Sequence, residues 1–248
     1  NYNTVVGDEA GTAITTGDQN VAVGFEALKT TTTAGNNTAL GYKALRLNTT
    51  GNANVAVGVV ALGANTTAVD NTAVGYNSLG ANTTGDRNTA LGRNSLASNV
   101  DGDRSVAVGY DALSSQDPSS NVDMYNVGVG YAAGAAVTTG VQNTLIGGLA
   151  GDALTEADAN VAIGKGALTT DTLGSSSVAV GNNALTNQNF TSATDTYNVA
   201  VGKNAGLAVT TGIQNTFIGG LSGDATTTAN NNAAFGYGSL GANTTGAL

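Results

Sequence analysis

The chain has 248 residues, 41% of them hydrophobic, so it can bury a substantial core and lacks the composition of a disordered protein. Its 17 acidic and 8 basic residues give a net charge of −9 without a basic cluster, which argues against nucleic acid and anionic lipid as partners. There is no cysteine for a disulfide or a thiolate site, and no apolar run reaches the roughly 20 residues that span a bilayer, so we expect no membrane insertion in this segment.

A quintet of the form Asn-x-Ala-aliphatic-Gly recurs, with few departures, fourteen times. Eleven of the thirteen intervals between its glycines are 17 residues long, and the other two are 21. A fixed period of this kind is the signature of a solenoid, in which each repeat buries its apolar face against its neighbours. We therefore predict one β-roll repeat domain over residues 1–248, and, since the repeat runs to both ends, a segment of a longer fibre.

Each quintet is predicted to form a short strand. Numbered from its glycine as zero, position −4 is Asn or Ser, −3 is Thr, Val or Ala, −2 is usually Ala, and −1 is always apolar. Such residues favour a strand, and the recurring Gly and Thr exclude a helix. The residues that define the repeat are represented by the pairs Asn20 and Gly24, Asn54 and Gly58, Asn71 and Gly75, and Asn160 and Gly164.

A second segment follows the glycine. Position +3 is always Ala or Ser, and position +4 is Leu nine times and Gly five times, which predicts a second, shorter strand. A Thr-Thr-Gly turn then closes the coil, and we expect its glycines where the chain needs a positive φ or a close backbone approach. Two strands and two turns in 17 residues predict an all-β fold, a flattened parallel β-roll solenoid of about 14 coils.

Alternation along the strand makes a prediction about assembly. Positions −3 and −1 point to one face and −4, −2 and 0 to the other, so we place the aliphatic −1 residues inside the roll and the Ala column outside. A strand that is apolar on both faces is normally buried on both, and a second copy of the chain is the simplest cover. The alternative is an Ala column that faces solvent.

The Asn column at −4 also has two interpretations. Stacked Asn side chains at the roughly 4.8 Å strand spacing can link their amides into a ladder. Asn is also a turn residue and could simply mark the entry to each strand. Neither role is catalytic.

Both 21-residue intervals carry their extra residues between the +4 Leu and the next Asn, over residues 114–125 and 186–197. Insertions in solenoids map to loops on one face, often a binding face. Duplication of a larger block is the alternative, because residues 125–152 closely resemble residues 197–224. The candidate binding-loop residues are Asp117, Pro118, Asp123, Met124, Tyr125, Phe190, Asp195 and Tyr197.

No constellation of catalytic residues emerges. The chain has no His, and its Asp residues, such as Asp86 and Asp103, are scattered singly as turn formers rather than paired or set at metal-ligand spacing. We therefore predict no enzyme activity, no metal and no cofactor. The tyrosines just after the glycine are either exposed for contact with sugars or stacked on one another: Tyr42, Tyr76, Tyr110, Tyr131 and Tyr237.

The quintets Asn20-Val-Ala-Val-Gly24 and Asn160-Val-Ala-Ile-Gly164 resemble the head repeats of YadA-like trimeric autotransporter adhesins, and the stretch from Asn71 to Leu79 is similar to repeats of bacteriophage tail fibres. The resemblance implies a left-handed β-roll, a homotrimer, and attachment to a host cell or surface through a glycan or protein receptor. It implies an extracellular place, on a virion tail fibre or a bacterial surface. The 17-residue period exceeds that of the adhesin heads, so their turn geometry is not carried over.

An ice-binding or other extracellular matrix-type β-solenoid is the alternative function. Thr occupies position +8 in eleven repeats and +9 in nine, which places a Thr column along one edge of the coils. Adjacent Thr residues point to opposite sides, however, so turn chemistry explains this column better.

Overall fold

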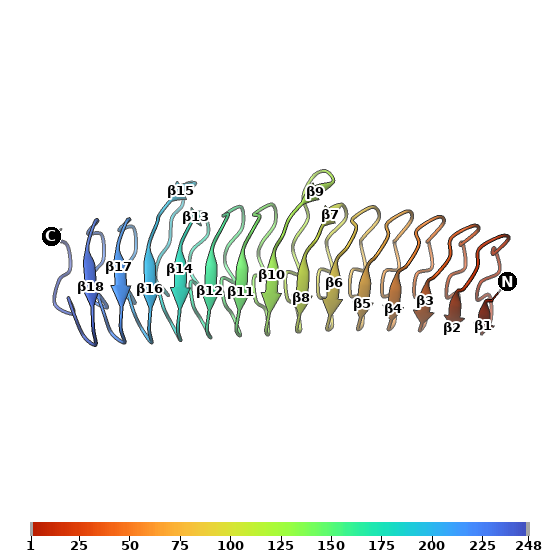
Figure 1. The fold of residues 1–248 in the computed structure, drawn as a ribbon, viewed down its shortest axis with the longest axis horizontal. Coiled ribbons are helices and arrows are strands. Elements are labelled where there is room, and N and C mark those ends of the chain that lie inside the picture. Colours follow the sequence, from red (N-terminus) through yellow and green to blue (C-terminus); the bar gives the residue numbers. More distant parts are fainter. Residues whose placement is uncertain (1, 247–248) are drawn as a thin grey trace. The chain divides into compact units, whose positions relative to one another are not determined.

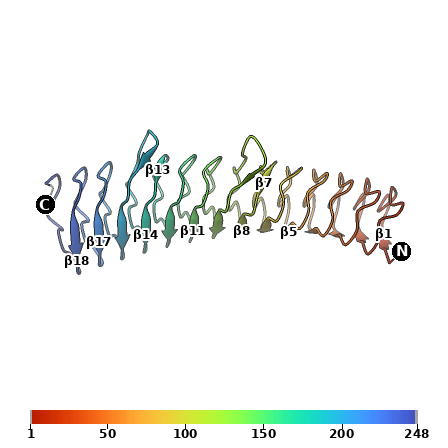
Figure 2. The same ribbon diagram turned by 45° about the horizontal axis from the view of Figure 1, so that its top comes forward.

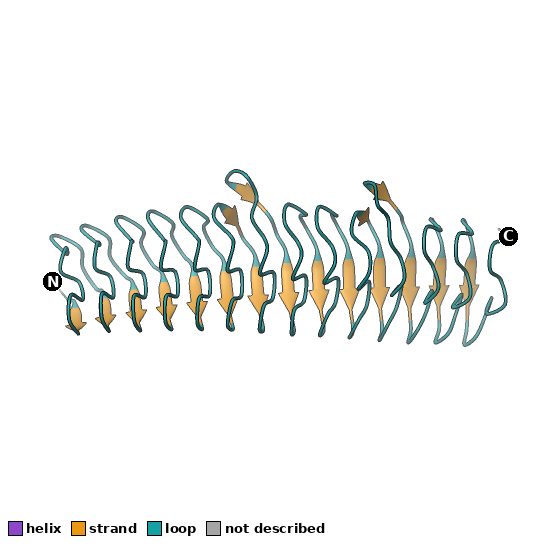
Figure 3. Ribbon diagram, turned by 180° about the vertical axis from the view of Figure 1, so that it is seen from behind, coloured by secondary structure: helices purple, strands orange, loops and turns teal. Residues whose placement is uncertain are grey.

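The computed structural model describes residues 2–246 and shows a parallel β-solenoid with no helix among those residues (Figures 1 and 3). Each coil contributes one three-residue strand at positions −3 to −1 of a quintet, and turns and loops form the rest. The chain divides into two compact units, residues 1–125 and residues 126–248. Each unit contains seven quintet strands, which confirms the predicted solenoid of about 14 coils.

The first unit stacks its quintet strands in chain order, each parallel to the next. Equivalent positions pair, as Thr38 does with Val55 and Leu40 with Val57. The strands are β1 (Thr4–Val6), β2 (Val21–Val23), β3 (Thr38–Leu40), β4 (Val55–Val57), β5 (Thr72–Val74), β6 (Thr89–Leu91) and β8 (Val106–Val108). A separate two-stranded parallel sheet joins β7 (Gly102–Asp103) to β9 (Val122–Asp123) at the first insertion.

The second unit repeats this arrangement. Its quintet strands are β10 (Val127–Val129), β11 (Thr144–Ile146), β12 (Val161–Ile163), β14 (Val178–Val180), β16 (Val199–Val201), β17 (Thr216–Ile218) and β18 (Ala233–Phe235). The second insertion forms the parallel pair β13 (Gly174–Ser175) and β15 (Thr194–Asp195).

The two faces of each strand are the reverse of the sequence prediction. Ala at −2 is fully buried, as at Ala22, Ala56 and Ala90, whereas the aliphatic residue at −1 points outward and is 46% exposed at Leu40. The −4 Asn lies on the same face as the −2 Ala and is buried with it, because side chains two apart share a face. The prediction that the −1 residues fill the interior was wrong.

The interior is narrow, and this explains why Ala occupies it. Position +4 faces position −2 of the same coil across the core, so a large residue at one requires a small residue at the other. Where −2 is Leu145, position +4 is Gly151, and a Cβ added there would lie 2.7 Å from Leu145 Cδ2. Where −2 is Phe217, a Cβ at Gly223 would lie 2.4 Å from its ring. Each of the nine Leu residues at +4 has Ala at −2 of its own coil, which leaves space for it, and eight of the nine are fully buried. Two coils have Gly at +4 without a large −2 residue, since Gly134 is combined with Gly128 and Gly206 with Ala200.

The predicted second strand is absent from the described residues, where turns follow the quintet glycine. The nine Leu residues at +4 have φ between 47° and 58°, in the left-handed region, which is incompatible with an extended segment. Hydrogen bonds between coils stabilise this conformation. The N–H of Leu45 donates to the Ala61 carbonyl at 3.0 Å, and that of Lys43 donates to the Phe25 carbonyl at 2.9 Å.

The glycines occupy the conformations expected of them. Gly58 has φ 136°, and a Cβ there would lie 2.3 Å from the carbonyl oxygen of Gly75 in the next coil. At the Thr-Thr-Gly turn, a Cβ on Gly51 would lie 2.2 Å from the carbonyl oxygen of Ala68. A positive φ or a close backbone approach therefore excludes side chains at these positions.

The −4 Asn column links neighbouring coils through buried hydrogen bonds. Asn71 Oδ1 accepts from the backbone N–H of Asn88 at 2.9 Å, and its Nδ2 donates to the Gly85 carbonyl at 2.9 Å. Amide-to-amide bonds also occur, such as Asn71 Nδ2 to Asn54 Oδ1 at 3.3 Å. Amide-to-amide bonds thus join part of the column into a ladder, and the side-chain-to-backbone bonds fix the entry to the strands, so both interpretations hold. The same pair of side-chain-to-backbone bonds is made by Asn20, Asn37, Asn54, Asn88, Asn143, Asn160 and Asn215.

A second amide ladder, at position +7, was not predicted. Asn65 donates to Asn48 at 2.9 Å, Asn82 to Asn65 at 3.1 Å, and Asn99 to Asn82 at 3.2 Å, in each case from Nδ2 to Oδ1. These residues are fully buried in the first unit. Buried amides tolerate this environment because each finds a partner in the neighbouring coil.

Candidate interaction surfaces

The outward face of the quintet strands presents two columns, an apolar one at position −1 and a mixed one at position −3, where six of the fourteen residues are Thr. In the first unit Val21, Leu40, Val74, Leu91 and Val106 are between 36% and 46% exposed. In the second unit Ile146, Ile163 and Ile218 are between 36% and 38% exposed, and Phe235 is 67% exposed. Contiguous exposed apolar surface on a folded protein marks an interaction site. We refer to these side chains as the outer sheet face.

Position +1 places a row of aromatic and cationic side chains beside the outer sheet face of the first unit. The rings of Phe25 and Tyr42 stack with centroids 5.5 Å apart, and the Arg93 guanidinium lies 5.4 Å from the Tyr76 ring and 5.7 Å from that of Tyr110. The three tyrosines are exposed. Stacking and exposure therefore occur together, and contact with sugars stays a prediction. In the second unit Tyr131 and Tyr237 are also exposed.

The first insertion stands out from the edge of its coils beside β9 (Figures 1 and 2). Asp117, Asp123 and Tyr125 are exposed, whereas Pro118 and Met124 are buried. Met124 fills the space above Gly102, where a Cβ would lie 3.0 Å from Met124 Cγ. Two of the five candidate binding residues thus anchor the loop instead of facing a ligand.

The exposed part of this loop is closed by its own contacts. Arg104 forms an ion pair with Asp123, and its guanidinium lies 5.8 Å from the Tyr125 ring. The Tyr125 hydroxyl donates to Asp123 Oδ2 at 3.2 Å. These three side chains contact one another, and the binding of a receptor by Asp123 and Tyr125 stays a prediction.

The second insertion has the same division of roles. Phe190 is 7% exposed, and its backbone N–H donates to the buried Asp171 carboxylate at 3.0 Å. Asp195 and Tyr197 are exposed. Tyr197 and Tyr125 share a left-handed backbone with φ 51°, in keeping with an inherited duplication.

Both insertions begin at a paired substitution that the sequence analysis missed. Where Ser replaces Asn at −4, Gln occupies +7 of the same coil. Ser105 Oγ donates to Gln116 Oε1 at 3.2 Å, and Gln188 Nε2 donates to Ser177 Oγ at 2.8 Å. The longer Gln reaches the shorter Ser, and this recurrence was readable from the sequence.

The isolated aspartates act as turn acceptors, as predicted. Asp86 Oδ1 accepts from the Val69 N–H at 2.7 Å, and Asp103 Oδ1 accepts from the Asp86 N–H at 2.7 Å. The hydroxyls of the +8 threonines are similarly engaged, since Thr49 Oγ1 donates to the Thr66 carbonyl at 3.0 Å. An ice-binding function would therefore have to use the exposed threonines at +9.

A cluster of charges lies on the turns of the first three coils. Lys29 donates to Glu26 at 2.6 Å and also pairs with Glu9, while Lys43 and Arg46 lie 3.8 and 3.6 Å from Glu26 Oε2. The hydrogen bond from Lys29 lowers the pKa of Glu26, and the same bond raises the pKa of Lys29. With two carboxylates and three cations, the cluster has a local charge of about +1 in a chain of net charge −9.

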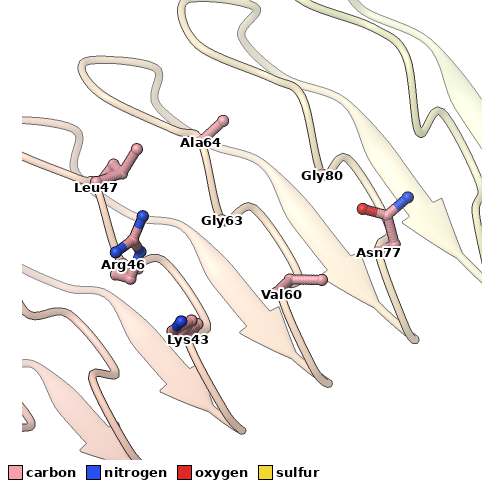
Figure 4. Close-up of a pocket in the computed structure, with 8 residues that line it drawn as sticks. All are labelled: Lys43, Arg46, Leu47, Val60, Gly63, Ala64, Asn77 and Gly80. Carbon is pink, nitrogen blue, oxygen red and sulfur yellow. The ribbon is translucent and has the colours of Figure 1, made fainter.

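A groove of about 330 Å³ opens beside this cluster and crosses three successive coils (Figure 4). One row of its lining comes from position +2, with Lys43, Val60 and Asn77, and another from +5, with Arg46, Gly63 and Gly80. Leu47 and Ala64 complete the lining. The lining includes two cations and no carboxylate.

No family model, curated protein or solved structure matches this chain. Among residues 2–246, no three or more His, Cys, Asp or Glu side chains gather as metal ligands would. No helix of this described range is long and apolar enough to cross a membrane.

Proposed function

We propose that this chain is a structural and adhesive segment of a homotrimeric extracellular fibre that attaches to a host cell or surface. The outer sheet face is the observation that carries the proposal. Each coil adds two outward side chains at positions −3 and −1, and the −1 residue is aliphatic or aromatic in all fourteen quintets.

Although the inner and outer faces of the strand are the reverse of the sequence prediction, one apolar face still lacks a cover within the chain, and a further copy of the chain can cover it. The inner face is covered by the chain's own Leu and Ala side chains, and the outer face has no such cover in the described residues. Strands of parallel sheets are normally buried on both faces. A second and third copy of the same column, stacked at the same strand spacing, match it repeat for repeat.

The resemblance to YadA-like adhesin heads and bacteriophage tail-fibre repeats supports three chains and a left-handed coil. A place on a virion tail fibre or a bacterial surface follows from the same resemblance. In such an assembly the +1 aromatic row and the edges of the coils lie at the margin of the apolar contact and are available to a glycan or protein receptor.

The mass of the chain in solution, measured by light scattering, tests the assembly. We expect about three times the 24.2 kDa of one chain. Val57→Lys together with Val74→Lys places charges in the outer sheet face and should yield the monomer mass, because two lysines per chain would be desolvated at the interface. Thr67→Lys, at an exposed turn, is the matched control and should remain trimeric.

A monomeric wild-type chain would overturn the trimer. The attachment function is tested separately by binding of the fluorescently labelled trimer to bacterial and animal cells. Failure to bind any cell type above the level of a labelled protein of equal net charge would overturn it.

A further inference from the structure

The groove beside Lys43 and Arg46 has a definite cause in the sequence. Position +5 is Lys29 and Arg46 in two successive coils and then Gly63 and Gly80 in the next two, so the row of side chains stops and leaves a hollow. The Asn77 amide projects into the space left by Gly80, where a Cβ would lie 2.0 Å from Asn77 Oδ1. The close-up shows Lys43 and Arg46 at one end of the groove and Asn77 at the other (Figure 4).

Hydrogen bonds fix the orientation of the amide. Asn77 Nδ2 donates to Asn94 Oδ1 at 3.3 Å, and Asn94 Nδ2 donates to Asp111 Oδ1 at 3.0 Å. This chain of bonds directs the Asn77 carbonyl oxygen, a hydrogen-bond acceptor, toward Gly80. Val60 lies between the two ends, with φ 52°, the left-handed conformation that residues at +2 adopt throughout the solenoid.

The chemistry of the groove combines three kinds of contact. Lys43 and Arg46 supply positive charge, Asn77 supplies an amide acceptor, and Val60 with Leu47 supplies apolar surface. Lys43 and Arg46 share one carboxylate oxygen, Glu26 Oε2, at 3.8 and 3.6 Å, and the other oxygen of Glu26 accepts from Lys29 at 2.6 Å. The two groove cations therefore exceed the single carboxylate that faces them. Lys43 Nζ also lies 4.8 Å from the exposed Tyr42 ring, next to the groove.

A smaller hollow in the second unit repeats this combination. About 320 Å³ in volume, it is lined by Lys203, Asn204, Gly220, Leu221 and Tyr237. Asn204 Oδ1 is a buried acceptor with no hydrogen-bond partner among the described residues. A cation, an amide, an apolar side chain and a gap left by glycine thus occur together twice.

We propose that the groove binds a carboxylated saccharide, with the carboxylate on Arg46 and Lys43, a hydroxyl donating to Asn77 Oδ1, and a sugar face against Val60 and Leu47. A guanidinium pairs bidentately with a carboxylate, as it does with a phosphate, and the pyranose of an acidic sugar supplies the hydroxyls and C–H groups that the remaining lining accommodates. Nucleic acid is disfavoured because two cations cannot offset the repulsion of a chain with net charge −9. The inference rests on the proposed attachment function and names its ligand class.

Calorimetric titration tests the proposal with two pairs of probes. Sialyllactose is compared with lactose, and tetragalacturonate with its uncharged methyl ester. We expect at least one acidic probe to bind about tenfold more tightly than its neutral match, since the difference is one charge-assisted contact.

Three variants locate the site. Lys43→Gln with Arg46→Gln should weaken the acidic probe about tenfold or more and remove its preference over the neutral match. Ala64→Glu, which adds a carboxylate to the lining, should do the same by pairing with the cations. Lys165→Gln removes an exposed cation outside both hollows and should leave binding unchanged.

Absence of binding by both acidic probes at millimolar concentration, or binding that all three variants leave unchanged, would overturn the proposal. Light scattering and cell binding on the same samples separate the two levels of inference. A trimer that attaches to cells and ignores both acidic probes defeats the saccharide proposal alone, whereas a monomer that attaches to nothing defeats the attachment function.

Discussion

The inner and outer sides of the same three-residue strand obey different rules. On the inner side the residue at −2 is Ala in most coils and the neighbouring −4 residue is Asn or Ser, and beyond the first coil these residues are buried. On the outer side the −1 residue is Val, Leu, Ile or Phe without a fixed size. The residue types on the inner side are therefore restricted by side-chain volume and by hydrogen bonding. The −1 residues on the outer side are restricted only to apolar types.

This difference follows from what each side contacts. The −2 side chain on the inner side packs directly against the +4 residue of the same chain. An added methyl group there would clash with a closely packed neighbour. Among the described residues the outer side is only partly covered, and its −1 side chains stay exposed to solvent. The proposed contact between copies of the chain would account for this apolar character, which the packing of one chain does not require.

The largest effect is expected from breaking the inner hydrogen bonds. Asn71→Ala removes the acceptor for the buried Asn88 N–H, which is left unpaired, and one of two donors to the Gly85 carbonyl, which keeps its bond from Asn82 Nδ2. We expect a loss of about 2–4 kcal/mol in the free energy of unfolding, measured by urea denaturation. Asn182→Ala, at an exposed position, should cost less than about 0.5 kcal/mol, and equal losses would contradict the comparison.

A single inner methyl group should have an intermediate effect. Ala73→Val overfills the core against Leu79 and should cost about 1–3 kcal/mol, whereas Val74→Ile, one residue along on the outer side, should cost almost nothing. Adding Leu79→Gly to Ala73→Val recreates the pairing of Val5 with Gly11 in the first coil and should recover part of the loss. Additive losses in this double variant would show that positions −2 and +4 do not compete for the same space.

The smallest effect is expected for the ion pair of Glu26 with Lys29, for which pH is the probe. The hydrogen bond from Lys29 holds the pKa of Glu26 below its ordinary value of 4.5, so the pair stabilises the fold above that pH. This contribution is lost as the pH falls through the lower pKa of the folded protein. The Tm of wild type should therefore drop slightly more than that of Glu26→Gln between neutral pH and pH 3. Equal decreases in Tm for the wild type and Glu26→Gln would show that the Glu26–Lys29 pair does not contribute to stability.

The repeat predicted the position and pairing of the strands because Asn and Gly mark the ends of each quintet. The predicted faces were wrong for a physical reason: Val, Ala and Val are all apolar, so hydrophobicity cannot tell inside from outside. Size could have decided it. Gly replaces Leu at +4 where −2 is Val5, Leu145 or Phe217, and this exchange of volume shows which positions face each other.

Other features carried weaker signals. The left-handed Leu at +4 has no signature in residue type, since its conformation is stabilised by hydrogen bonds between coils. The exposed tyrosines at +1 were anticipated, and the groove was not. Its signal lay in two successive glycines at +5, Gly63 and Gly80, beside the cations of the preceding coils.

The Asn column also sets a unit of growth. Each Asn presents to the following coil the same acceptor that the preceding coil presented to it, so any coil can follow any other. Duplication of 17 residues then lengthens the protein by one strand spacing, roughly 4.8 Å, and the added coil makes the same contacts with its neighbours as the existing coils do. The length of such a protein therefore changes in steps of one coil, through the number of repeats in its gene, and the sequence of each repeat can stay the same.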